Sequence, residues 1–410
     1  MTRHQITIEQ LIQELCPKGV KFMELGELGV FYGGLSGKSK DDFGGGNAKY
    51  VTYMNIASNI AVDTKISTLV KVAENENQNK IEYGDSLFTG SSETPDEVGM
   101  SSVMTKKVSE PLYLNSFCFG FRLHDKYLFL PEFLKYLFRD SEIRKQIIKT
   151  ASGVTRYNVS KKRFAKIRIP LPPLAIQEEI VKILDSFTEL ETELETELET
   201  RKIQYRHYYQ ELLSFGNNVD SSSLIDVANF TNGKGHEKHI DENGKYIVVN
   251  SKFVSTEGRV KKYSVKQISP VFKEDILMVM SDLPNGKALA KCFFVDEDDK
   301  YTLNQRICAL KVKDNEKLNA KFLFYILNRN KQLLRYDSGA DQTNLRKDDI
   351  LNIKIPVPPL ADQKHIISIL DKFDALVNDI TVGLPAELNA RRQQYEYYRN
   401  KLLTFKEYAG

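Results

Sequence analysis

The stretch PLPPLAIQEEIVKILDSF at residues 170–187 recurs, with substitutions, as PVPPLADQKHIISILDKF at residues 356–373. The offset between these two stretches is 356 − 170 = 186 residues. A second pair, YRHYYQELLSF at 205–215 and YEYYRNKLLTF at 395–405, is separated by 395 − 205 = 190 residues. This period is far longer than the roughly 20 to 50 residues of a solenoid unit. We infer that a whole domain followed by a helix is used twice in this chain.

Weaker repeats lie upstream of each of these stretches. They pair Gly84-Asp85 with Glu274-Asp275, Leu114-Asn115 with Leu303-Asn304, and Ser152-Gly153 with Ser338-Gly339. Between these short repeats the two halves of the chain differ strongly. Similar ends with dissimilar middles favour one common framework that carries two different binding surfaces.

Each long repeated stretch predicts a helix that begins after a proline pair, at 172–173 and at 358–359, because proline is not accommodated inside a helix. Apolar residues then recur at every third or fourth position, which is typical of a helix that packs along a partner helix. This predicted stripe consists of Ile180, Leu184, Phe187, Leu190, Leu194, Leu198 and Tyr205 in the first copy and Ile366, Leu370, Phe373 and Tyr395 in the second. Gly383 and Pro385 interrupt the second copy, so we expect a break there and a further helix from about Pro385 to Phe405.

Residues 188–200 read TELETELETELET, a tandem four-residue repeat. One such unit adds about 6 Å to a helix and turns it about 40° beyond a full turn. Adding or deleting a unit would therefore change the length of the helix without breaking it; the alternative is an acidic surface that serves only solvation. We expect the helices to pair antiparallel with a domain at each end, a pseudo-two-fold arrangement that suits two half-sites on one duplex.

Composition predicts a folded protein of two domains. The chain has 410 residues, of which 41% are hydrophobic and 28% charged, and its formal net charge is +3. Its four cysteines show no CxxC spacing, which favours free thiols in a reducing compartment over a zinc site. The N-terminus is polar and no apolar run approaches the ~20 residues of a membrane span, so we predict a cytoplasmic protein.

The segments outside the helices indicate an α+β fold with antiparallel or mixed sheet. Strands are predicted at 49–56, 116–124, 245–254 and 306–313, and helices at 133–147 and 321–334. The predicted organisation is a first domain at 1–169, a helical spacer at 170–215, a second domain at 216–355 and a second helical spacer at 356–410.

Two kinds of polar, basic segment are candidates for DNA contact. Residues 32–40, YGGLSGKSK, and 232–239, NGKGHEKH, combine glycines that expose backbone N–H groups with lysines that neutralise phosphate charge; a plain surface turn is the alternative. Further clusters precede each helical spacer, where Asn and Gln can bind adenine edges and Arg can bind guanine, although the same residues also cap helices and line turns. The candidate DNA contacts are Lys38, Lys40, Arg156, Tyr157, Asn158, Lys161, Lys162, Lys234, Lys238, Gln342, Thr343, Asn344, Arg346 and Lys347.

No catalytic motif is recognisable. The nucleotide-binding loop needs four residues between its glycines, whereas Gly33 and Gly37 enclose three. The proline pairs are flanked by leucine and valine rather than by the Asn/Asp and aromatic residue that grip a flipped adenine. The histidines do not form an HExxH motif, and metal binding at His236 and His239 has little support. We therefore predict a DNA-binding protein that is not an enzyme and holds no metal.

Taken together, the PLPPLxxQ helix starts, the YxYY…LL helix ends, the break at 383–385 and the TELE repeats resemble the specificity subunit of type I restriction-modification systems. They are most similar to the subfamily with short tandem repeats in the central spacer. The resemblance implies two target-recognition domains, each of which reads one half of a bipartite DNA target, and coiled-coil helices that set the gap and dock two methyltransferase subunits.

The resemblance also implies that restriction subunits complete the complex. It further implies that the partner subunits use S-adenosylmethionine, ATP and Mg²⁺, and we expect this chain to bind no cofactor itself. Two alternatives remain open at this point: a stand-alone DNA-modifying enzyme and a scaffold that binds proteins.

Overall fold

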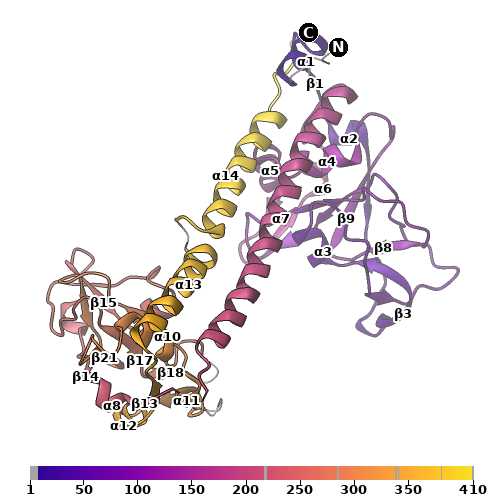
Figure 1. Cartoon of the computed structure of the whole chain (residues 1–410). Helices are drawn as coiled ribbons and strands as arrows, with labels where there is room; N and C mark the ends of the chain where they lie inside the picture. Colours follow the sequence, from indigo (N-terminus) through magenta and orange to yellow (C-terminus); the bar gives the residue numbers. More distant parts are fainter. Residues whose placement is uncertain are drawn as a thin grey trace. The chain divides into compact units, whose positions relative to one another are not determined.

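The computed structural model describes residues 8–216, 219–283, 286–337, 339, 341–379 and 381–408, which form two compact units (Figure 1). Unit 1 comprises Met1–Glu195 and Leu388–Gly410, and unit 2 comprises Thr196–Glu387. The 39-residue helix α7 (Leu174–Leu212) contributes its first part to unit 1 and its last part to unit 2. No helix in the described ranges is long and apolar enough to cross a membrane.

Corresponding sheets are built in both units. In unit 1, the four-stranded sheet consists of β2 (Gly29–Gly33), β9 (Cys118–Leu123), β5 (Ser86–Thr89) and β7 (Ser101–Val103) in that order. Its counterpart in unit 2 consists of β14 (Ala228–Asn232), β21 (Ile307–Val312), β17 (Ile276–Val279) and β19 (Cys292–Phe294). The predicted strands 116–124 and 306–313 are therefore confirmed as the second strands of these sheets.

Smaller sheets also correspond between the units. Unit 1 holds β4 (Leu69–Val70), β3 (Phe43–Val51) and β8 (Leu112–Leu114), and unit 2 holds β16 (Tyr263–Ser264), β15 (Tyr246–Val249) and β20 (Tyr301–Leu303). The pairs β3–β8 and β15–β20 are parallel, whereas β3–β4 and β15–β16 are antiparallel. The pair β1 (Lys21–Glu24) with β12 (Arg168–Leu171) corresponds to β13 (Ser221–Ser223) with β23 (Lys354–Pro356). The predicted α+β fold with mixed sheet is confirmed.

The strands predicted at 49–56 and 245–254 are correct only in their first halves. After β3 and β15 the chain forms short helices, α3 (Tyr53–Ser58) and α9 (Ser251–Ser255). The side chains of Thr52 and Asn250 cap these helices by accepting the backbone N–H groups of Asn55 and Phe253, at 3.1 and 2.8 Å. In both units, a residue that caps a helix lies inside the apolar run, so the strand ends earlier than the run predicts.

The helices predicted at 133–147 and 321–334 are each divided in two. Unit 1 forms α4 (Pro131–Leu137) and α5 (Ser141–Lys149), and unit 2 forms α10 (Ala320–Leu327) and α11 (Lys331–Leu334). The N-caps of the second helices are Asp140 and Asn330. Both side chains accept backbone N–H groups of the following turn, so a new helix begins at these residues.

Each unit contains a pair of long helices that closes its core (Figure 1). In unit 1, α7 lies beside α14 (Leu384–Leu403), and the ring of Phe187 stacks on Tyr398 at 5.4 Å. In unit 2, the last part of α7 lies beside α13 (Leu360–Asn378), and Tyr208 stacks on Phe373 at 5.3 Å. Each copy of the tyrosine-rich stretch thus packs a tyrosine against a phenylalanine of the neighbouring long helix, one copy in each unit. The predicted break is confirmed, because α13 ends at Asn378 and α14 begins at Leu384.

The stripe of α7 that faces α14 departs from the prediction at one position. Leu190 is 44% exposed and lies outside the buried core of unit 1. Glu191 takes this place and pairs with Nε of Arg392 at 2.6 Å, and Glu195 pairs with Nη2 of the same residue. The reason is helical periodicity: four residues after Phe187 lie on the face that the heptad repeat buries, whereas three residues after it lie at its edge.

Two buried glutamines hold the helix starts in place. Gln177 of α7 accepts the N–H of Leu130 at 2.9 Å and donates to the carbonyl oxygens of Leu128 and Pro172 at 3.0 and 2.8 Å. Gln363 of α13 accepts the N–H of Asn319 and donates to Lys317 and Pro358 in the same way. Both glutamines are fully buried, so the Q of the repeated PPLxxQ motif is a packing determinant.

We expect Gln177→Ala to destabilise unit 1 by about 2 to 4 kcal/mol, because it leaves one buried N–H and two buried carbonyl groups without their partner. Urea unfolding of the full chain, followed by tyrosine fluorescence and circular dichroism, measures the change. Gln210→Ala, at an exposed position of the same helix, is the matched control and should change stability by less than about 0.5 kcal/mol. Equal effects of the two substitutions would contradict the anchoring role.

Candidate nucleic-acid interface

The first predicted polar cluster lies on a small sheet of unit 1. Its strands are β10 (Ala151–Ser152), β11 (Tyr157–Val159) and β6 (Ser91–Ser92), and the short helix α6 (Lys161–Phe164) follows. Of the residues predicted here, Arg156, Asn158, Lys161 and Lys162 are exposed, whereas Tyr157 is half-buried. The structure therefore brings these side chains together at one end of a strand ladder.

Arg156 is held in a defined position at the start of β11. Its Nε donates to Oγ of Ser91 at 3.0 Å, and its guanidinium lies over the ring of Phe117 at 5.5 Å. The turn before it requires glycine, because Gly153 has φ of +145° and an added Cβ would lie 1.9 Å from the carbonyl oxygen of Arg156. The Ser-Gly pair of the first repeat thus shapes the turn that presents Arg156.

The second cluster lies on the equivalent strands of unit 2, β18 (Ser281–Asp282) and β22 (Thr343–Asn344). Nε2 of Gln342 donates to Oγ of Ser281 at 2.7 Å, and the side chain of Asn344 is exposed. Ser338, the second copy of the repeated serine, lies outside the described residues.

Other residues of the second cluster differ in their access to a ligand. Thr343 is only 9% exposed, so the prediction of a DNA contact through its side chain is corrected. Arg346 and Lys347 are exposed around the start of α12 (Lys347–Leu351), and the ammonium of Lys347 lies 5.6 Å from the ring centre of Phe230.

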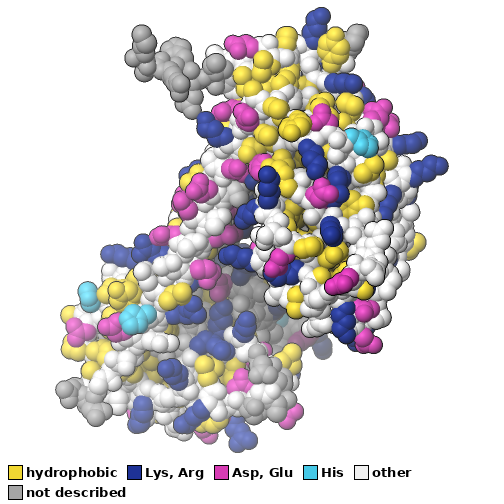
Figure 2. Space-filling model, turned by 90° about the vertical axis from the view of Figure 1, so that its right-hand side faces the viewer, with side chains coloured by type: hydrophobic (Ala, Val, Ile, Leu, Met, Phe, Trp, Pro, Cys, Tyr) yellow, Lys and Arg dark blue, Asp and Glu magenta, His cyan; other side chains and the backbone are white. Residues whose placement is uncertain are grey.

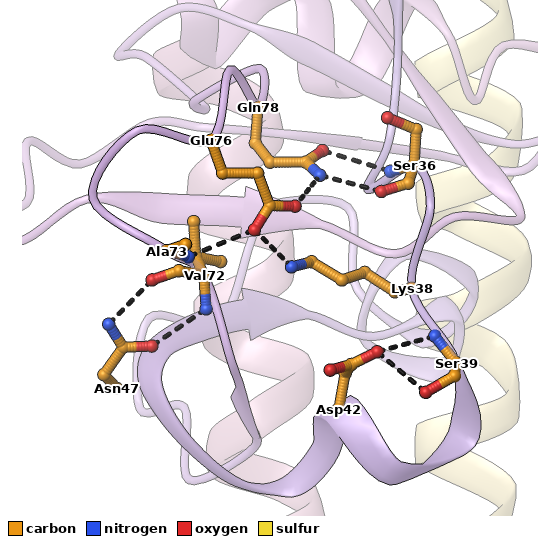
Figure 3. Close-up of polar contacts among 9 residues, drawn as sticks. All are labelled: Ser36, Lys38, Ser39, Asp42, Asn47, Val72, Ala73, Glu76 and Gln78. Carbon is orange, nitrogen blue, oxygen red and sulfur yellow. Dashed lines mark hydrogen bonds and ion pairs between the residues drawn. The ribbon is translucent and has the colours of Figure 1, made fainter.

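The glycine-containing loop 32–40 is held by a network of side chains (Figure 3). Nζ of Lys38 lies 2.5 Å from a carboxylate oxygen of Glu76, and the Lys38 side chain is only 7% exposed. The hydrogen bond from Lys38, with further ones from Gln78 and the backbone of Ala73, lowers the pKa of Glu76 to about 2. The prediction that Lys38 contacts a phosphate is therefore corrected, because its charge already neutralises Glu76.

The same network fixes the backbone of the loop on both sides of Lys38. Gln78 accepts the N–H of Ser36 at 3.0 Å and donates to its carbonyl oxygen at 2.8 Å. Asp42 accepts the N–H and the hydroxyl of Ser39 at 2.7 and 2.8 Å (Figure 3). Lys40 remains exposed at the start of this turn and stays a candidate phosphate contact.

The loop 232–239 of unit 2 is organised by a buried histidine. The ring nitrogens of His236 lie 2.7 Å from the carbonyl oxygen of Lys234 and 2.7 Å from Oγ1 of Thr302. The side chains of Lys234 and Lys238 are exposed. Figure 2 shows Lys and Arg side chains spread over the face of the molecule that is drawn there. Within the described ranges there is no group of three or more His, Cys, Asp and Glu residues that could hold a metal ion.

Two serines and one turn that belong to these surfaces were not predicted from the sequence. Ser91 and Ser281 have no distinguishing pattern around them. The turn that carries Phe117 in unit 1 carries Arg306 in unit 2, and both side chains are exposed. The repeated Leu-Asn pairs lie two to three residues before these positions and could have located the turn.

Comparison with known proteins gives a consistent result. The family model described as type I restriction modification DNA specificity domain matches residues 17–201 and again residues 217–390. The chain is 35% identical over 263 residues to the type I restriction enzyme EcoR124I/EcoR124II specificity subunit of Escherichia coli, an alignment that covers 58% of this chain and 63% of that protein. It is 32% identical over 272 residues to a putative type I restriction enzyme specificity subunit of Haemophilus influenzae, covering 62% and 68% of the two chains.

Solved structures show the same fold. The S subunit of a type I restriction-modification system from M. genitalium aligns with a TM-score of 0.52 at 16% identity, covering 94% of this chain and 96% of that one. A chain from a study of complex assembly and conformational transition of the type I R-M system aligns with a TM-score of 0.62, also at 16% identity, covering 94% and 98%. Since the family model matches nearly the whole sequence in two copies, the chain belongs to the family of type I restriction-modification DNA specificity domains.

Proposed function

We propose that this chain is the sequence-specific DNA-recognition subunit of a type I restriction-modification complex and is itself not catalytic. One observation carries the proposal: both units present an exposed polar cluster at the end of the same strand ladder, β6–β11 in unit 1 and β18–β22 in unit 2. In each unit this cluster immediately precedes the strand and the long helix that close the core. Two such surfaces fit a bipartite target, one half for each unit.

The long helices are proposed to set the gap between the half-sites and to bind two methyltransferase subunits. Several apolar side chains on them are exposed, as expected of a surface that a partner covers: Ile203, Tyr208 and Tyr397 are 59%, 41% and 63% exposed. The partner subunits would use S-adenosylmethionine for methylation, and restriction subunits would use ATP and Mg²⁺. We place the complex in the cytoplasm, where its DNA substrate is found.

The test is production of the full chain together with methyltransferase subunits, followed by sequencing of methylated adenines in the host DNA. We expect a single bipartite motif with an unspecified gap of fixed length, and two protected patches when the purified complex is footprinted. The methyltransferase subunits without this chain are the control and should leave no motif. Methylation by the purified chain alone, or a complex that protects no DNA, would contradict the proposal.

A further inference from the structure

We propose that the residue two positions before the cluster asparagine, Arg156 in unit 1 and Gln342 in unit 2, is the base-reading position of each domain. Arg156 would bind a guanine in one half of the target, and Gln342 an adenine in the other. This inference rests on the proposed function and assigns which residue decides the base at one position of each half-site.

The strand ladders make these two positions equivalent. Asn158 of β11 lies opposite Ser91 of β6, and Asn344 of β22 lies opposite Ser281 of β18, in antiparallel pairs of the same register. Arg156 and Gln342 each precede these asparagines by two residues. The backbone thus places Arg156 and Gln342 at equivalent positions of their strand ladders.

The same polar contact then orients both side chains. Nε of Arg156 donates to the hydroxyl of Ser91, and Nε2 of Gln342 donates to the hydroxyl of Ser281, at 3.0 and 2.7 Å. The two serines are 6% and 5% exposed, whereas Arg156 and Gln342 are exposed. A buried hydroxyl therefore holds one nitrogen of each exposed side chain and reduces the entropy that is lost when the remaining polar groups bind a base.

The groups that remain at the two tips have different chemistry. In Arg156 the hydroxyl of Ser91 accepts the N–H of Nε. The two terminal nitrogens make no hydrogen bond to the described residues, so this end of the side chain offers donors only. Guanine offers two acceptors in the major groove, N7 and O6, which match such a pair of donors. Gln342 retains its amide oxygen and a second N–H, an acceptor beside a donor, which matches N6 and N7 of adenine.

The neighbouring turn also differs between the two units, in a way that fits an arginine in unit 1 and a glutamine in unit 2. The N–H of Gly90 donates to the carbonyl oxygen of Phe117 at 2.8 Å, and the N–H of Met280 donates to that of Arg306 at 2.9 Å, so positions 117 and 306 correspond. In unit 1 the exposed ring of Phe117 supports the guanidinium plane of Arg156. In unit 2 a ring is absent from that position, and an amide side chain needs no such support. The two units therefore differ in the side chain at this position, although their backbone hydrogen bonds correspond.

The test uses the full chain assembled with methyltransferase subunits and compares the motifs of methylated DNA. Arg156→Gln should reduce the preference for guanine at one position of one half-site by about 10- to 100-fold and shift it toward adenine, while the gap and the other half-site stay unchanged. Gln342→Arg should shift one adenine position of the other half-site toward guanine. Arg156→Lys keeps the charge but loses the fork of donors, so it should relax that position while binding persists.

The control is Arg163→Gln, which removes an exposed arginine of α6 whose Nη2 contacts Oγ of Ser152 at 3.1 Å. This substitution should weaken binding equally for all sequences and leave the motif unchanged. If the wild-type complex shows no bipartite motif, the proposed function itself fails. If the wild-type motif is present and stays unchanged in Arg156→Lys and Gln342→Arg, the inference is overturned, even where Arg156→Gln does not assemble.

Discussion

A chain in which residues 1–169 are replaced by the corresponding segment of another family member should direct methylation to a target changed in one half only. The polar cluster of unit 1 lies entirely within this segment, as does Lys40. The cluster of unit 2 is untouched, so its half-site and the gap should persist. Sequencing of methylated adenines measures all three features of the target in one experiment.

The exchange depends on the contacts that the segment makes with the retained helices. Ile176, Ile180 and Leu184 of α7 are buried in the core of unit 1, with Leu402 and Leu403 of α14. A donor segment therefore needs an apolar face of similar volume there. Its control is the same exchange with a donor of identical target specificity, which should leave the motif unchanged. A change in both half-sites would refute the assignment of one reader to each unit.

Deletion of Thr192–Glu195 should shorten the gap between the half-sites by about one to two base pairs, since about 6 Å of helix compares with ~3.4 Å per base-pair step. The boundary between the two compact units falls inside the TELE repeat, between Glu195 and Thr196. Helix α7 is continuous through this point, so a deletion here changes the length of helix that joins the units. The methylated motif reports the gap directly.

The repeat also explains why such a deletion should be tolerated. Arg392 of α14 pairs with Glu191 and Glu195, which are four residues apart. After deletion of one unit, Glu199 takes the place of Glu195, so two carboxylates four residues apart still face Arg392. The deletion turns the following helix by only about 40° relative to the preceding part.

A two-residue deletion, Thr192–Glu193, is the matched control for this prediction. It shortens the helix by half as much but turns the following part by about 200°, which moves the buried stripe to the opposite side. We expect this variant to lose methylation of the bipartite motif. A gap that stays the same after the four-residue deletion would refute the role of the helix in spacing, and equal activity of both deletions would refute the register argument.

Much of the helical framework was predictable from local signals. Proline pairs and apolar spacing located the starts of α7 and α13, and Gly383 with Pro385 located the break before α14. These signals act within a few residues of chain, because proline excludes the helical hydrogen bond and the stripe follows the 3.6-residue turn. The capped helices α3 and α9 were missed, because their apolar residues also fit a strand and only the single cap residues, Thr52 and Asn250, distinguished them.

The sequence by itself determined the duplication, the family, the α+β class and the polar clusters, because each follows from residues close together in the chain or from their repetition. Only the tertiary structure decided which side chains are free to bind. Lys38 is neutralised by Glu76, 38 residues away, and Arg156 is oriented by Ser91, 65 residues away. Hydrogen bonds and ion pairs of this kind depend on distances of about 3 Å between atoms that no local pattern brings together.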